Sequence, residues 1–163
     1  MSELLFLDIE WANDAHDLVS LALINVDGSR LLYIERNPLP PNPSAFVLDV
    51  VYPLLDRGTA ALTDPNFTEA MRELVAARHT PRIHFDSPWD KVLLGHAMSG
   101  WGRCLVDIPS FALVLVDRAD VRDEVKLYFQ NNPWTLERRH HAAVDVDAPR
   151  LHRGIGSVPR WWT

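Results

Sequence analysis

The chain has 163 residues, of which 47% are hydrophobic and 23% are charged. This is an ordinary globular composition, and the length suits one domain with a sizeable core. No apolar run approaches the roughly 20 residues that cross a membrane, and the single cysteine excludes an intrachain disulfide framework. We therefore expect one domain over residues 1–163, without membrane contact and located in the cytoplasm.

The formal net charge is −6. This charge is unfavourable for a protein that binds nucleic acid through lysine and arginine alone. It is compatible with an enzyme that holds phosphates through metal ions. Such an enzyme needs clustered carboxylates, and bound cations then reverse the local sign of the charge.

The first part of the chain predicts an antiparallel meander. Residues 4–11 are apolar almost throughout, which suits a central strand covered on both faces. Residues 18–24 form a second apolar run, and the turn signal Asp27-Gly28 leads into a third at residues 30–34.

Two helices are predicted next. Four prolines between residues 37 and 43 interrupt regular structure, and Ser44 can then cap a short helix that runs towards Tyr52. Asp64 as N-cap and Pro65 as the first helical residue predict the second helix. Its apolar stripe consists of Phe67, Met71, Leu74 and Val75.

The rest of the chain is predicted to alternate between strands and helices. Residues 82–85 favour a strand, and Ser87-Pro88 predicts the start of a helix that stops near Gly100. A strand is expected within residues 111–116. Further helices are expected over residues 121–129 and 142–151. A meander followed by this alternation implies an α/β fold, with a mixed antiparallel and parallel sheet flanked by helices.

Asp8 and Glu10 interrupt the C-terminal end of the first apolar run. Residues i and i+2 of a strand point to the same face, so two carboxylates would lie close together. A divalent cation such as Mg²⁺, which prefers oxygen ligands, relieves their repulsion. The alternative is a strand end at which both acids simply reach solvent.

Asp90 follows the predicted helix start. An acid in the first turn is favoured by the helix dipole and by free N–H groups, and this alone explains it. The functional alternative is a third metal-binding carboxylate.

His140 and Asp145 form the last candidate group. Five residues of an ideal helix turn through about 500°, so the two side chains converge only if His140 lies in the turn before the helix. The histidine would then be a base beside a metal ligand. The alternative is a polar helix start at the surface. Zinc is disfavoured, because Cys104 has no ligand-like spacing to the adjacent pair His140 and His141.

Together, these motifs resemble those of the DEDDh 3′–5′ exonucleases, relatives of oligoribonuclease and ribonuclease T. The first motif is the Asp-x-Glu at Asp8 and Glu10, the second contains Asp90, and the third, His-x-Ala-x-x-Asp, runs from His140 to Asp145. Their order and spacing match the family across nearly the whole chain.

The mycobacterial-type exoribonuclease branch is the closer match. Its members have an aromatic residue where Trp11 stands and a segment similar to residues 42–55. That branch is associated with RNA. Trp11 itself has two interpretations, because it can stack on the terminal base of a substrate, worth about 1–3 kcal/mol, or belong to the core.

The chain departs from the family pattern at three places. Many relatives have Asn at the position of Asp86, so the second-motif carboxylate is assigned to Asp90 rather than Asp86. Val146 and then Asp147 follow the last motif, where relatives have a small residue. Pro149 stands where the last helix should continue, and it predicts a kink or a different helix start.

The resemblance implies a ribonuclease H-like fold and hydrolysis of single-stranded RNA or short oligonucleotides to nucleoside 5′-monophosphates. Two Mg²⁺ or Mn²⁺ ions would be held by Asp8, Glu10, Asp90 and Asp145, and His140 would take a proton from the attacking water. Relatives are often homodimers, so a homodimer is one expected state.

The sequence is also compatible with other functions. A DNA exonuclease or a dinucleotide-specific nuclease would use the same chemistry, and the negative charge without a basic arm makes short substrates plausible. A non-catalytic module that binds nucleic acid or protein could retain the fold without the metal. Stabilisation by divalent metal distinguishes this module from the enzymes.

Overall fold

The computed structural model describes residues 3–13, 17–103, 106–116 and 118–147. These residues form a six-stranded mixed sheet in the order β4-β3-β2-β1-β5-β6. Its centre is an antiparallel meander of β1 (Leu4–Trp11), β2 (Leu18–Asn25) and β3 (Arg30–Arg36). The predicted meander is therefore confirmed.

Parallel pairs extend the sheet on both sides of the meander. The short β4 (Ala61–Leu62) pairs with β3. On the other side β5 (Arg82–Phe85) pairs with β1, and β6 (Ala112–Leu115) pairs with β5. Because β1 and β5 are parallel, their carboxyl ends meet at the same edge of the sheet.

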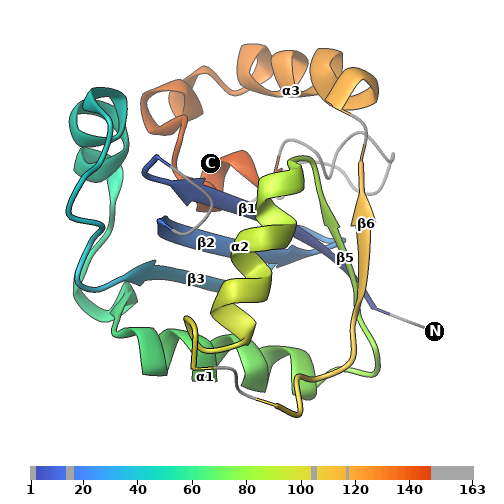
Figure 1. Cartoon of the computed structure of the whole chain (residues 1–163). Helices are drawn as coiled ribbons and strands as arrows, with labels where there is room; N and C mark the ends of the chain where they lie inside the picture. The colour runs from blue at the N-terminus through green and yellow to red at the C-terminus, as the bar shows by residue number, and fades with distance from the viewer. Residues whose placement is uncertain (1–2, 14–16, 104–105, 117, 148–163) are drawn as a thin grey trace.

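Helices cover both faces of the sheet (Figure 1). On one face, α1 (Asp64–Ala76) and α2 (Pro88–Met98) share a core cluster with the odd-numbered residues Leu5, Leu7 and Ile9 of β1. On the other face, the short α4 (Ala142–Asp145) packs against Phe6 of β1. The predicted mixed α/β sheet flanked by helices is thus confirmed. No helix of the described ranges is long and apolar enough to span a membrane.

The remaining helical segments lie beyond the edges of these layers. They are α3 (Arg118–Asn131) and four short segments, η1 (Val47–Val51), η2 (Tyr52–Leu54), η3 (Gly58–Ala60) and η4 (Pro133–Arg138). Figure 1 shows η1 and α3 at the end of the sheet where β1 ends. As predicted, Ser44 precedes the first of them, and its Oγ accepts a hydrogen bond from Val47 N at 3.2 Å.

The helix starts confirm one sequence prediction and correct another. Ser87 Oγ accepts a hydrogen bond from Trp89 N at 3.3 Å and caps α2. The N-cap of α1 is Thr63 rather than the predicted Asp64. The Asp64 carboxylate instead binds Arg36 Nε at 2.7 Å, which ties α1 to the end of β3.

The last predicted helix is only partly described. It begins at Ala142, as expected, and α4 ends at Asp145. Pro149 and the predicted helix end at Leu151 lie outside the described residues.

Candidate active site

The C-terminal end of β1 carries two of the predicted site residues. Asp8 pairs with Ala22 and Glu10 with Ser20 of β2. Strand alternation places both carboxylates on the α4 side of the sheet, together with Phe6. The pairing predicted from the Asp-x-Glu spacing therefore holds in the fold.

Trp11 lies just past an irregularity in the strand. The register of β1 against β2 shifts between Glu10 and Trp11, and such shifts re-aim the side chains beyond them. Trp11 packs against the core cluster under α1 and α2, and it also lines the cavity at the end of β1. The structure therefore shows Trp11 packed against the core with part of its surface in the cavity, and stacking on a substrate base stays a prediction.

His140 lies in the turn before α4, as the spacing to Asp145 required. Its backbone N–H donates to Asp145 Oδ2 at 3.1 Å, and its φ of +73° is left-handed. One ligand atom from each of Glu10, His140 and Asp145 lies within 4.8 Å of the other two. The first and third sequence motifs therefore meet at one place.

The second motif contributes charge to the same place. Asp90, in the first turn of α2, is buried at 1% exposure. Its charge helps to raise the pKa of both Asp8 and Glu10. Asp86 follows directly after β5 and also helps to raise the pKa of Asp8 and Asp145.

A cavity of about 970 Å³ opens at this cluster. Asp86 lines it together with the carboxylates of β1, whereas Asp90 lies outside the lining. The sequence assigned the second-motif role to Asp90 rather than Asp86, and the structure brings both close to Asp8. The sequence could have pointed to Asp86 as a site residue. It directly follows β5, and the carboxyl ends of neighbouring parallel strands lie at the same end of a sheet.

The other walls of the cavity come from η1, α3 and η4. An apolar wall is formed by Phe46, Val47, Val51, Val125, Phe129 and Leu136. Two cations, Lys126 and Arg139, line the same space. The cavity thus has an acidic end on β1 and an apolar, cationic side, which suits an elongated ligand with both phosphate and ring groups.

The carboxylates of the cluster share one electrostatic problem. Burial, followed by the charges of Glu10 and Asp145, raises the pKa of Asp8 well above its usual range. Burial and then Asp145 and Asp90 do the same for Glu10. Burial also raises the pKa of Asp145 to about 6, against the hydrogen bond from His140 N. The cluster is therefore poorly stabilised as a set of anions.

The donor set fits a hard divalent cation. Asp8 Oδ2 and Asp145 Oδ1 are buried and accept no hydrogen bond from the residues that the structure describes. Glu10 adds further carboxylate oxygens, and the His140 imidazole lies beside those of Glu10 and Asp145. Mg²⁺ and Mn²⁺ prefer such oxygen-rich sets with few protein ligands, so Asp8, Glu10 and Asp145 can hold a cation here.

The raised pKa of Asp145 predicts a pH-dependent stability. When the pKa of a carboxyl group is higher in the folded than in the unfolded state, the group increasingly destabilises the fold as pH rises from its unfolded-state pKa to its folded-state pKa. For Asp145 this window runs from 3.8 to about 6. In metal-free protein, the Asp145→Asn variant should gain roughly 1–3 kcal/mol in free energy of unfolding over wild type across this window.

Thermal melts of both proteins in chelator, at a series of pH values, measure this difference. Asparagine keeps an oxygen for the His140 N–H, so the hydrogen bond is retained and only the charge is lost. A difference in Tm that does not grow with pH would contradict the electrostatic account of the cluster.

No protein-family model matches this chain, and a search of curated proteins finds no significant match. The resemblance to DEDDh exonucleases therefore rests on the three motifs and on the residues that they bring together.

Proposed function

We propose that this protein is a metal-dependent 3′–5′ exonuclease of ribonuclease H-like fold, with single-stranded RNA as its first expected substrate. One observation carries the proposal. Three segments that are far apart in the sequence bring Asp8, Glu10, Asp86, His140 and Asp145 into the lining of one cavity. The charge of Asp90, which lies outside this lining, acts on Asp8 and Glu10. A fold without catalysis has no need to gather these groups at the cost of raised carboxyl pKa values.

In this proposal, Asp8, Glu10 and Asp145 hold Mg²⁺ or Mn²⁺, and Asp86 and Asp90 support a second ion. When bound, the ions supply charge for the scissile phosphate and lower the pKa of a water molecule. The protein's own groups orient the substrate and move the proton.

His140 is the proposed general base. Burial, and then the charge of Arg139, lowers the pKa of its ring below the usual 6.5. The ring is therefore neutral at pH 7 and can accept a proton from the attacking water. The hydrogen bond from its backbone N–H to Asp145 Oδ2 fixes the turn from which the ring enters the cavity.

The walls of the cavity suit a single-stranded chain end. Base–aromatic contacts tolerate any sequence, and Trp11, Phe46 and Phe129 all line the space. Phe46 also contacts the His140 ring edge-on at 5.0 Å between ring centroids. A base held by these side chains would bring its phosphate to the carboxylates.

Lys126 provides a test of substrate binding separate from catalysis. It lines the cavity on the α3 side, where it can neutralise a phosphate upstream of the scissile one. Lys126→Ala should raise the KM for single-stranded RNA with little change in kcat. The slope of log KM against log salt should flatten by about 0.7, the value for one phosphate contact on a single strand.

The control for this prediction is Lys91→Ala, since Lys91 is exposed on α2 and lies outside the cavity lining. Steady-state kinetics at several salt concentrations measure both variants. If log KM has the same slope against log salt in wild type and Lys126→Ala, Lys126 does not contact a substrate phosphate.

The proposed function is tested by digestion of matched single-stranded RNA, single-stranded DNA and dinucleotides with Mn²⁺. We expect products shortened from the 3′ end, RNA cleaved faster than DNA, and no cleavage in chelator. Preference for dinucleotides would identify the short-substrate alternative. If no substrate is cleaved and Mn²⁺ does not raise Tm, the proposal is wrong and a non-catalytic binding module remains.

A further inference from the structure

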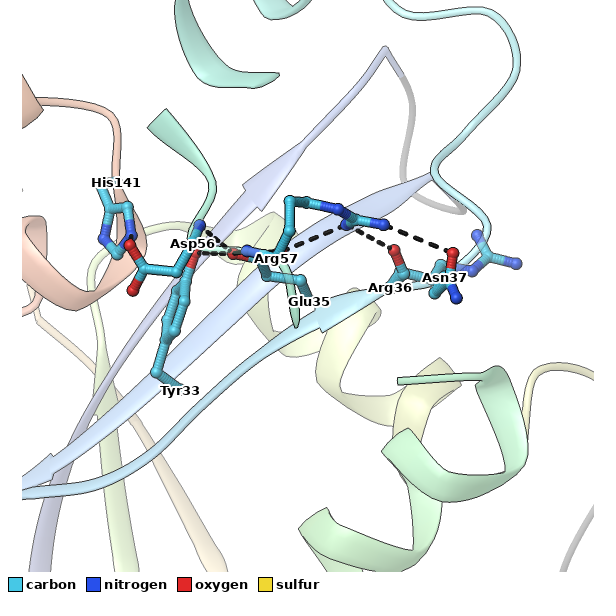
Figure 2. Close-up of polar contacts among 7 residues, drawn as sticks. All are labelled: Tyr33, Glu35, Arg36, Asn37, Asp56, Arg57 and His141. Atoms are coloured by element: carbon cyan, nitrogen blue, oxygen red, sulfur yellow. Dashed lines mark hydrogen bonds and ion pairs between the residues drawn. The ribbon is translucent and has the colours of Figure 1, made fainter. Parts of the chain in front are cut away.

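Glu35, on β3, is a fully buried carboxylate outside the cavity. Its Oε1 accepts hydrogen bonds from Tyr33 Oη at 2.7 Å and from Asp56 N at 2.6 Å. Its Oε2 accepts from Arg57 N at 3.0 Å and Arg57 Nη1 at 3.2 Å. Figure 2 shows these donors converging on Glu35. A buried charge with this many donors is compensated, and it fixes the positions of its donors.

Two of the residues that donate to Glu35, Tyr33 and Asp56, also contact the segment that carries His140. The Tyr33 ring stacks on the His141 ring, with 4.5 Å between centroids and 25° between planes. Asp56 Oδ1 accepts a hydrogen bond from Arg138 Nη2 at 2.7 Å and lies 3.6 Å from His141 Nε2. Figure 2 places His141 beside Asp56 and Tyr33. The residues on either side of position 140 are therefore held by two groups that share one Glu35 oxygen.

His140 is a residue that needs such support. Its φ of +73° lies in the left-handed region, which residues other than glycine seldom adopt. A conformation of this kind persists when the surrounding contacts over-determine it. The local contact is the His140 N–H bond to Asp145 Oδ2, and the contacts at 138 and 141 fix both ends of the turn.

The Asp56–Arg138 ion pair is poorly suited to a purely stabilising role. Both side chains are 42% exposed, and ion pairs of this exposure add little to stability. Its position matters more than its strength, because it joins the loop after η2 to a residue 82 positions later in the sequence.

We infer that Tyr33 and Asp56, both anchored by Glu35, are positioning residues that hold His140 against the carboxylates of Glu10 and Asp145. The inference rests on the proposed function, since it assigns the purpose of the network to the orientation of a general base. Neither residue lines the cavity, so neither contacts the substrate there.

The test uses Asp56→Ala and Tyr33→Leu in the full-length protein. Each should lower kcat about 10- to 100-fold, the range for a displaced catalytic group. KM and the Mn²⁺ affinity measured by calorimetry should change less than about two-fold, because the carboxylates and the cavity walls keep their places. Asp56→Asn keeps an acceptor for Arg138 and should retain most of kcat.

The matched control is Asp64→Ala. It removes an ion pair of the same 2.7 Å length, Asp64 with Arg36, in which Asp64 is also partly exposed and lies away from the cavity lining. Its kcat should equal that of wild type. A loss of kcat in Asp64→Ala as large as in Asp56→Ala would show a general loss of structure and would overturn the inference.

A second readout separates this inference from the proposed function. In NMR spectra of metal-free protein, the His140 ring resonances should shift or broaden in Asp56→Ala and stay unchanged in Asp64→Ala. If wild type cleaves RNA and both Asp56→Ala and Tyr33→Leu keep the wild-type kcat, the positioning role is overturned while the nuclease proposal stands. If wild type cleaves nothing and the His140 resonances still shift, the nuclease proposal fails, and the network is shown to hold the His140 ring without serving this reaction.

Discussion

Asp8→Asn is expected to abolish Mn²⁺-dependent hydrolysis, with a loss of kcat/KM on the order of 10³-fold or more. The reason is that a bound cation contributes several kcal/mol of charge stabilisation to the reaction, and Asp8 lies at the centre of the cluster. Its pKa is influenced by Glu10, Asp145, Asp90 and Asp86 together. A neutral amide keeps the shape of the side chain and removes the charge that holds the cation.

The same substitution should stabilise the metal-free protein. Burial and like charges raise the pKa of Asp8 well above its usual range, so at pH 7 this carboxyl group destabilises the folded state relative to the unfolded chain. Asp8→Asn removes this penalty, and Tm in chelator should rise while the increase caused by Mn²⁺ disappears. A gain in stability with a loss of activity is typical of a functional site.

The control is Asp49→Asn, an exposed carboxylate on η1, which should change neither activity nor the response of Tm to Mn²⁺. Wild-type activity in Asp8→Asn would show that the cluster at the end of β1 is not the catalytic centre.

His140→Ala is expected to lower kcat by about 10²- to 10⁴-fold, the usual contribution of a general base. The Mn²⁺ affinity should fall far less, because the carboxylates of Asp8, Glu10 and Asp145 remain. Burial and Arg139 keep the pKa of the His140 ring below 6.5, so the wild-type base is already neutral at pH 7. Above that pH the wild-type rate should be flat.

The pH profile gives this prediction a second readout. Without the imidazole, the reaction depends on hydroxide, so the rate of His140→Ala should rise with pH where wild type stays level. The control is His79→Ala, an exposed histidine between α1 and β5. Parallel pH profiles for wild type and His140→Ala would assign the proton transfer to another group.

Strand geometry explains why Asp8 and Glu10 could be predicted from sequence. The apolar run identified β1 as a covered central strand, and the period of two then placed both acids on one face. The turn required for His140 followed from helix geometry in the same way. These inferences depend only on residues that are neighbours in the sequence.

The choice between Asp86 and Asp90 could not be made in this way. Both residues precede or open α2, and their distances to Asp8 depend on how β5 is paired with β1. The structure places Asp86 in the cavity lining and Asp90 in the buried first turn of α2. A family pattern that provides one carboxylate at this point gave no reason to expect two.

The Glu35 network was also beyond the reach of the sequence. Its contacts join β3, the loop after η2 and the turn before α4, and no local pattern links Tyr33 or Asp56 with Arg138. Periodicity identifies the face of an element, whereas contacts between distant polar side chains depend on the packed fold. Trp11 shows the same limit, because the shift in register at Glu10 decides its direction.

Product analysis tests the central claim most directly. Metal-free wild type and Asp8→Asn would each be incubated with single-stranded RNA, with and without added Mn²⁺, and the products would be identified by mass spectrometry over time. We predict that wild type with Mn²⁺ releases nucleoside 5′-monophosphates stepwise from the 3′ end, and that chelator or the Asp8→Asn substitution stops the release. Intact RNA in the wild-type reaction, or the same products at the same rate from Asp8→Asn, would contradict a metal-dependent exonuclease centred on this carboxylate cluster.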